Sequence, residues 1–194
     1  VDITLKPLEF HTLAIEGPVP APVMLPPAPQ KPQGAGVVRH VGPSAEFKTI
    51  QQAVDAAKPG DTILVAPGTY APFATKNDFL TIRSEAGAEK TTIDAKGEGR
   101  CVTLTARPFA NMYGETNTVV EGFTLTGGVA DRTRLHKNRG GLALGGTLRN
   151  CVLTGGVAQY GGAAAYVRLE KCVLRGNRAT KCGGAGAFVR AFDS

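Results

Sequence analysis

Val-Glu-Gly-Phe-Thr-Leu-Thr-Gly-Gly at Val120–Gly128 recurs as Leu-Arg-Asn-Cys-Val-Leu-Thr-Gly-Gly at Leu148–Gly156 and as Leu-Glu-Lys-Cys-Val-Leu-Arg-Gly-Asn at Leu169–Asn177. The three copies begin 28 and 21 residues apart. A period of this length, with short strands and no helix, is typical of one coil of a β-solenoid, in which each coil buries its inner side chains against its neighbours. The repeat therefore predicts an all-β protein, a single-stranded solenoid of parallel strands whose crossovers are right-handed.

Aligned positions indicate which side chains point into the solenoid. Three inward ladders are expected: Val120, Leu148 and Leu169; Phe123, Cys151 and Cys172; Leu125, Leu153 and Leu174. The stacked Cys151 and Cys172 would be close enough for a disulfide, but their parallel Cβ vectors favour buried free thiols. Cys101 and Cys182 have no aligned partner, and the cysteines leave the redox compartment open.

Glycines mark the corners of the predicted coil. Gly127-Gly128, Gly155-Gly156 and Gly176-Asn177 occupy aligned positions where the chain must bend, and Gly and Asn tolerate a positive φ. A phosphate-binding loop is the other interpretation of such glycines, but no helix follows them to supply its dipole.

The sequence before the repeats predicts one helix and one strand. Thr49 and Gln52 have the spacing of a capping box, and apolar residues follow with helical periodicity. We expect a short amphipathic helix near Thr49–Lys58, ended by Pro59-Gly60, and then a buried strand at Thr62–Ala66.

Proline is concentrated near the N-terminus, where eight of the 13 prolines fall between Pro7 and Pro32. Such a stretch is typical of a semi-rigid polyproline linker. We therefore expect residues 1–36 to form an N-terminal segment and linker, and residues 37–194 to form the β-helix domain. Because Ser194 stands one strand into a further coil, we expect this domain to continue beyond it.

From the predicted helix onward the residues resemble a known family. The run FKTIQQAVDAAKPGDTILVAPGTY at Phe47–Tyr70, LTIRSE at Leu80–Glu85 and the repeat at Val120–Gly128 resemble the N-terminal part of right-handed parallel β-helix proteins of the pectin lyase-like superfamily. The resemblance implies that the helix caps the open end of the solenoid, where an uncovered coil would expose apolar side chains and strand edges. With the ladders, it leads us to expect about five to six coils.

The resemblance implies no particular reaction. Pectin methylesterases share the Phe-Lys-Thr-Ile-Gln-x-Ala-Val run, but their later catalytic motif with Gln-Asp-Thr has no counterpart in this sequence. Calcium-dependent pectate lyases present clustered acidic ligands, whereas only Asp131, Glu170 and Asp193 follow Glu121 here. We assign no catalytic residue, and we expect no metal site and no cofactor.

Composition and charge narrow the class of function. With 42% hydrophobic and 20% charged residues the chain is not a disordered polyampholyte, and no apolar run approaches the roughly 18 residues of a membrane-spanning helix. The net charge of +6 gathers late in the chain, where eight Arg and three Lys between residues 131 and 190 stand against two acidic residues. Such a positive field attracts polyanions. The alternative is that the charge serves only to keep the protein surface soluble. We expect no nucleic-acid partner, because only the overall charge favours one.

Two groups of residues are candidates for binding a polyanion. Seven extra residues enlarge one turn into a basic loop, and the following coils place an aromatic residue two positions before an arginine. If that strand is unbroken, both side chains lie on its outer face and form a sugar-stacking platform. The candidates are Arg132, Arg134, His136, Lys137 and Arg139 in the loop, and Tyr166, Arg168, Phe188 and Arg190 in the strand. The other interpretations are a solvated loop, and aromatic rings that pack against a loop or a neighbouring subunit.

These features lead us to expect an exported or cell-surface β-helix module that binds an acidic polysaccharide. Whether the complete protein also cleaves this polymer, as a polysaccharide lyase does, stays open at this point. The alternative is a non-catalytic structural β-helix of a surface or adhesin-like protein, because Gly-Gly-Ala and Gly-Asn corners also occur in such repeats. Neither interpretation fixes an oligomeric state.

Overall fold

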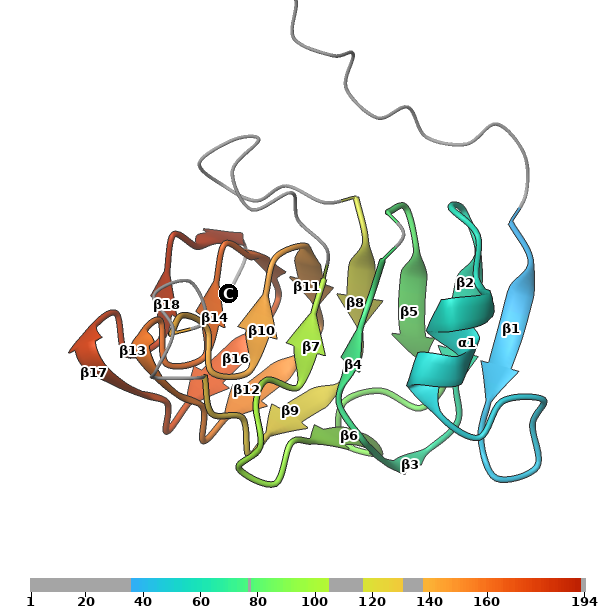
Figure 1. Ribbon diagram of the computed structural model, residues 1–194, viewed down its shortest axis with the longest axis horizontal. Coiled ribbons are helices and arrows are strands. Elements are labelled where there is room, and N and C mark those ends of the chain that lie inside the picture. Colours follow the sequence, from blue (N-terminus) through green and yellow to red (C-terminus); the bar gives the residue numbers. More distant parts are fainter. Residues whose placement is uncertain (1–35, 77, 105–116, 131–137, 193–194) are drawn as a thin grey trace, which may run out of the picture. The chain divides into compact units, whose positions relative to one another are not determined.

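A computed structural model describes residues 36–76, 78–104, 117–130 and 138–192 of the chain. These residues form a stack of coils in which all ladders between the described strands are parallel (Figure 1). The described part holds one leading strand at Val38–Val41, then five coils and the first strand of a sixth. The predicted fold class, an all-β parallel β-helix with a short N-terminal helix, is confirmed.

Three sheets run along the stack, and each coil contributes one strand to each of them. Sheet A consists of β1 (Val38–Val41), β2 (Thr62–Val65), β5 (Thr81–Ser84), β8 (Val119–Glu121), β11 (Thr147–Arg149), β15 (Arg168–Glu170) and β19 (Arg190–Phe192). Sheet B consists of β3 (Gly68–Tyr70), β6 (Thr91–Asp94), β9 (Thr124–Thr126), β12 (Val152–Thr154) and β16 (Val173–Arg175). Sheet C consists of β4 (Phe73–Ala74), β7 (Val102–Thr103), β10 (Ala143–Leu144), β14 (Ala164–Ala165) and β18 (Gly186–Ala187). The last two coils add the pair β13 (Val157–Tyr160) and β17 (Arg178–Cys182).

The inward ladders predicted from the repeat are confirmed. Val120, Leu148 and Leu169 are paired in sheet A, and Leu125, Leu153 and Leu174 are paired in sheet B. The third column consists of Phe123, Cys151 and Cys172, which are buried at the turns that lead from sheet A to sheet B. The core is therefore a set of columns of mostly aliphatic side chains. Among the described residues, Phe73 and Phe123 are the two aromatic residues that are buried in it.

The two glycines of each corner serve different purposes, which corrects the expectation that both need a positive φ. Gly127, Gly155 and Gly176 have φ of 66°, 71° and 62°. The second glycine instead makes room, because a Cβ on Gly128 would lie 2.3 Å from the carbonyl oxygen of Gly141. Asn177 takes this second place in the last coil, where its amide accepts a hydrogen bond from Gly156 N at 2.9 Å and donates one to the Leu153 carbonyl at 2.9 Å.

The helix α1 (Ile50–Ala56) begins with the predicted capping box, formed by Thr49 and Gln52. Its buried face packs against β1, β2 and β4, as Figure 1 shows at the N-terminal end of the coils. Gln51 covers the edge strand β4, since its side-chain amide accepts a hydrogen bond from Ala74 N at 2.9 Å and donates one to Ala74 O at 3.1 Å. An edge strand whose backbone groups are occupied in this way cannot pair with another chain.

Asp61 joins the parts of this capped end. Its carboxylate accepts hydrogen bonds from Val37 N at 2.8 Å, from Lys58 N at 3.0 Å and from Arg39 Nε at 3.1 Å, while the residue is only 4% exposed. Burial alone would raise the pKa of Asp61, but the hydrogen bonds from the two backbone groups and from Arg39 lower it overall. A single carboxylate therefore ties β1, the turn after α1 and the start of β2 together.

Replacing Asp61→Ala should lower the free energy of unfolding by about 3 kcal/mol at neutral pH, because the variant leaves a partly buried guanidinium and two backbone donors without their acceptor. The pKa of folded Asp61 lies below its ordinary value, so its stabilisation is complete above roughly pH 4 and is lost as the pH falls through the folded pKa. Urea unfolding of both proteins across this range measures the difference, which should shrink toward low pH. A difference that stays constant would contradict the assignment.

Leu153→Ala should cost about 2–5 kcal/mol, because the side chain is fully buried between Leu125 and Leu174 and its removal leaves a cavity. Thr154→Ala, one residue along, should cost less than about 1 kcal/mol, because this side chain lies on the outer face. Chemical denaturation compares the two variants. Equal losses would show that the ladder is misassigned.

Candidate functional site on the outer face of sheet C

The outer face of sheet C has a floor of small and aliphatic side chains. Ala143 and Ala164 belong to the core, so the alternate residues of the same strands point outward. This outer row contains Leu144, Ala165 and Ala187, which are paired in register. Aromatic residues stand on both sides of it, with Tyr160 before β14 and Tyr166 after β14.

Arg139 lies among three of these rings. Its guanidinium carbon is 5.7 Å from the ring centroid of Tyr160 and 5.5 Å from those of Tyr166 and Phe188. One of its terminal nitrogens donates a hydrogen bond to the Tyr166 hydroxyl. Tyr166 and Phe188 are stacked, with centroids 5.0 Å apart and planes within 2° of parallel. The rings therefore hold the cation in place through cation–π attraction.

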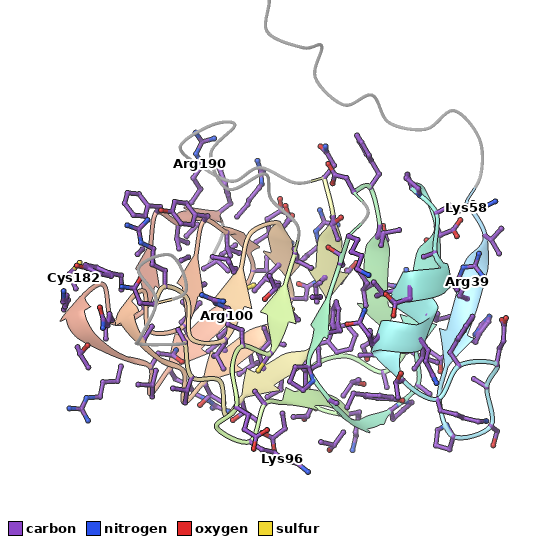
Figure 2. The ribbon with its side chains drawn as sticks, viewed as in Figure 1. Arg39, Lys58, Lys96, Arg100, Cys182 and Arg190 are labelled. Atoms are coloured by element: carbon purple, nitrogen blue, oxygen red, sulfur yellow. The ribbon has the colours of Figure 1, made fainter. Side chains whose placement is uncertain are left out.

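A second cation shares one of these rings. Lys181 Nζ is 5.4 Å from the centroid of Tyr160, on the strand that follows it in the stack. Arg100, labelled in Figure 2, supports the arrangement from the previous coil. Its Nε donates to the carbonyl oxygens of Arg139 and Gly140, both at 2.9 Å. In the described part of the chain, no carboxylate forms an ion pair with Arg139 or Lys181. This surface, which we call the arginine–aromatic site, thus carries positive charge beside exposed aromatic carbon.

The structure brings together three of the nine predicted site residues, Arg139, Tyr166 and Phe188. Arg132, Arg134, His136 and Lys137 lie outside the described residues. The position of their insertion is confirmed by the pairs on either side of it, Val129 with Val157 and Arg139 with Tyr160. Nine residues separate the first members of these pairs, and two residues separate the second members. Tyr160 and Lys181, which are not among the nine, complete the group.

The prediction of one unbroken strand through Tyr166 and Arg168 is wrong. Tyr166 and Phe188 have φ of 56° and 55°, in the left-handed region, so the chain turns there from sheet C into sheet A. The aromatic residues therefore face the outside of sheet C, whereas Arg168 and Arg190 form a paired rung on the outside of sheet A. The two halves of the predicted ladder belong to different faces.

Arg168 is engaged in contacts on sheet A. Its Nε donates to Glu170 at 2.7 Å, and its guanidinium carbon lies 4.1 Å from the ring centroid of Phe192. Glu170 accepts a second hydrogen bond from Arg149 Nε at 2.8 Å. The hydrogen bond from Arg149, and to a smaller extent that from Arg168, holds the pKa of Glu170 below its usual value. The charge of Arg168 is thus partly neutralised, which makes sheet A the weaker candidate for an anionic ligand.

The cysteines are free thiols, as expected for Cys151 and Cys172. Cys101, Cys151 and Cys172 are buried, and Cys182 is exposed beside Tyr160 at the edge of the arginine–aromatic site. Burial raises the pKa of Cys101 to about 12 and raises that of Cys151 as well. Within residues 36–76, 78–104, 117–130 and 138–192, no three His, Cys, Asp or Glu side chains gather as metal ligands. The same residues contain no helix with the length and hydropathy of a membrane span.

Parallel coils of this kind place the chain among the parallel β-helix proteins. More particularly, residues 38–194 match the family described as "Protein of unknown function (DUF1565)", and the chain belongs to this family.

Solved structures with a similar fold include pectin methylesterase PemA from Erwinia chrysanthemi, with a TM-score of 0.46 and 14% identity over 74% of this chain and 50% of that one. Another is the pectin methylesterase from Aspergillus niger in deglycosylated form, with a TM-score of 0.32 and 20% identity over 75% of this chain and 51% of that one. The chain therefore spans about half the length of these structures. No curated protein matches the sequence.

Cys182 should react with a thiol reagent in the folded protein, whereas the three buried cysteines should react only on unfolding. Mass spectrometry after brief treatment with iodoacetamide should show alkylation of the peptide that contains Cys182. Repeating the treatment in urea should modify all four cysteines. Rapid modification of Cys151 or Cys172 under native conditions would contradict the packing of the inner columns.

Proposed function

We propose that this β-helix binds an acidic polysaccharide at the arginine–aromatic site, as a module of an exported or cell-surface protein. The observation that carries the proposal is the guanidinium of Arg139 held against Tyr160, Tyr166 and Phe188. Lys181 adds a second positive charge on the same surface. The proposal concerns binding and names no catalytic residue.

The chemistry of the site fits a sugar that carries carboxylate groups. Guanidinium and ammonium groups form charge-assisted hydrogen bonds with carboxylates, and these bonds are stronger than those between neutral groups. Aromatic rings offer apolar area to the carbon-bound hydrogens of a sugar ring. Tyr166 covers one face of Phe188, yet Phe188 is still 52% exposed, so much of this ring remains open to a ligand.

The stacking of coils also suits a polymer better than a small ligand. Equivalent residues repeat along the stack, as Tyr166 and Phe188 do, so a surface built from them extends in the direction of the solenoid axis. Successive strands lie about 4.8 Å apart, and a chain of sugar units can contact several coils at once. Acidic polysaccharides occur outside cells, which is why the proposal includes an exported location.

Binding of polygalacturonate, measured by isothermal titration calorimetry at low salt, tests the proposal. We expect the affinity to fall steeply as salt is added, because exposed charges are screened over about 8 Å at physiological ionic strength. Phe188→Ala and Lys181→Gln should each weaken binding by about 5- to 20-fold, through lost apolar contact and lost charge respectively.

Two variants on sheet A and its corner serve as matched controls. Phe192→Ala removes another exposed aromatic ring, and Lys171→Gln removes another exposed lysine, so each should change the affinity by less than about twofold. Equal losses from site and control variants, or equal binding of acidic and neutral polymers, would refute the proposal. The structural, non-binding β-helix of a surface protein would then be the better interpretation.

A further inference from the structure

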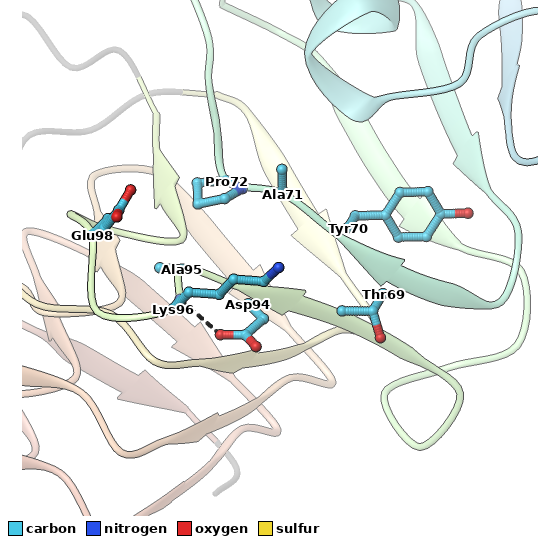
Figure 3. Close-up of a pocket in the computed structure, with 8 residues that line it drawn as sticks. All are labelled: Thr69, Tyr70, Ala71, Pro72, Asp94, Ala95, Lys96 and Glu98. Atoms are coloured by element: carbon cyan, nitrogen blue, oxygen red, sulfur yellow. Dashed lines mark hydrogen bonds between the residues drawn. The ribbon is translucent and has the colours of Figure 1, made fainter.

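A separate cavity of about 330 Å³ lies at the corner where β3 and β6 end, in the first two coils (Figure 3). Ala71 and Pro72 form one wall, and Figure 3 shows Asp94 and Lys96 facing them across the cavity. Its volume falls within the range of roughly 300–1,000 Å³ that is typical of ligand pockets. This cavity lies at the corner between sheets B and C in the first two coils, whereas Tyr160 and Lys181 belong to later coils.

Hydrogen bonds fix the polar wall of the cavity. Asp94 Oδ1 accepts a hydrogen bond from Lys96 N at 2.8 Å, and Glu98 N donates to the Ala95 carbonyl at 2.7 Å. Gly97 N also donates to the Gly127 carbonyl of the next coil at 2.7 Å. The turn that presents Asp94, Lys96 and Glu98 is therefore anchored both within itself and to its neighbour.

A row of hydroxyl groups continues from the cavity along sheet B. Asp94 is paired with Thr126, and Thr126 is paired with Thr154, so these three outward side chains are aligned on successive coils. Gly155 and Gly176 stand beside the threonines, and a Cβ at either position would be 3.9 or 4.0 Å from the nearer hydroxyl oxygen. Thr126 and Thr154 are both partly exposed, so their hydroxyls are accessible to a ligand.

We infer that the cavity and this row form a second binding site, for an uncharged oligosaccharide. Sugar hydroxyls both donate and accept hydrogen bonds, and the site offers carboxylate acceptors in Asp94 and Glu98, an ammonium donor in Lys96, and hydroxyls that do both. Two carboxylates against one ammonium leave the cavity negative. A uronate would meet like charge there, which is costly in a binding site.

The inference does not depend on the proposed function of sheet C. The two sites differ in the sign of their charge and in the coils that form them, and no residue belongs to both. One experiment can therefore report on each site separately.

The protein contains four tyrosines and no tryptophan, so incorporation of 3-fluorotyrosine gives four ¹⁹F resonances, which single Tyr→Phe variants assign. Tyr70 lines the cavity, whereas Tyr160 and Tyr166 belong to the arginine–aromatic site. Titration with cellohexaose and xylohexaose should shift the Tyr70 resonance in a saturable way with at least one of them. Titration with hexagalacturonate should leave the Tyr70 resonance in place, whatever it does to Tyr160 and Tyr166.

Variants locate the contact. Lys96→Met, which keeps the aliphatic stem and removes the donor, should weaken binding of the neutral hexamer about 5- to 10-fold, and Thr126→Val should weaken it less. Lys58→Met and Thr147→Val, at an exposed lysine and an outer threonine elsewhere, should leave binding unchanged. No Tyr70 shift with either neutral hexamer at millimolar concentration, an equal shift with hexagalacturonate, or equal losses in the control variants would overturn the inference.

Discussion

Each coil can bury its inner side chains only against the coils on either side, and this constraint determines the rest of the structure. Because parallel strands place residue above equivalent residue, the inner columns consist of apolar side chains that pack against one another from coil to coil, as in the column of Leu125, Leu153 and Leu174. Corners obey the same constraint, since the backbone of the next coil comes so close to Gly141 that a Cβ there would lie 2.3 Å from the carbonyl oxygen of Gly162. The first coil has only the single strand β1 on its N-terminal side, so α1 and Asp61 must complete its cover.

Features that repeat with the coil could be predicted from the sequence, because the same physical requirement acts several times. The inner columns, the corner glycines and the capping helix belong to this group. The turn at Tyr166 could not be predicted from its own coil, because Ala163–Ala165 and the residues that follow have the pattern of one continuous strand. A signal was available, since Gly145 aligns with Tyr166 and has a φ of 76°, so a glycine one coil earlier already marked this position as left-handed.

The candidate sites could be predicted only in part, because they depend on corners rather than on columns. Tyr160 and Tyr166 are close in sequence, yet they stand on opposite sides of β14, and Arg139 reaches both only because the insertion before it ends in register with Tyr160. The cavity beside Asp94 gave no sequence signal, because Asp94, Lys96 and Glu98 match no catalytic or metal-binding spacing. Their proximity to Pro72 follows from the stacking of two coils.

The outward side chains of the three sheets can differ from one another, because only the inward side chains are constrained by packing in the core. On sheet A, Arg83, Glu121, Arg149 and Glu170 are paired in succession, so opposite charges alternate and largely neutralise one another. Sheet C instead carries cations on aromatic rings, and sheet B carries a row of hydroxyls that begins at a carboxylate. Three faces with three kinds of chemistry share one core. A change on one face therefore leaves the columns beneath the other two intact, which is how one stack of coils can present separate surfaces for an acidic and an uncharged ligand.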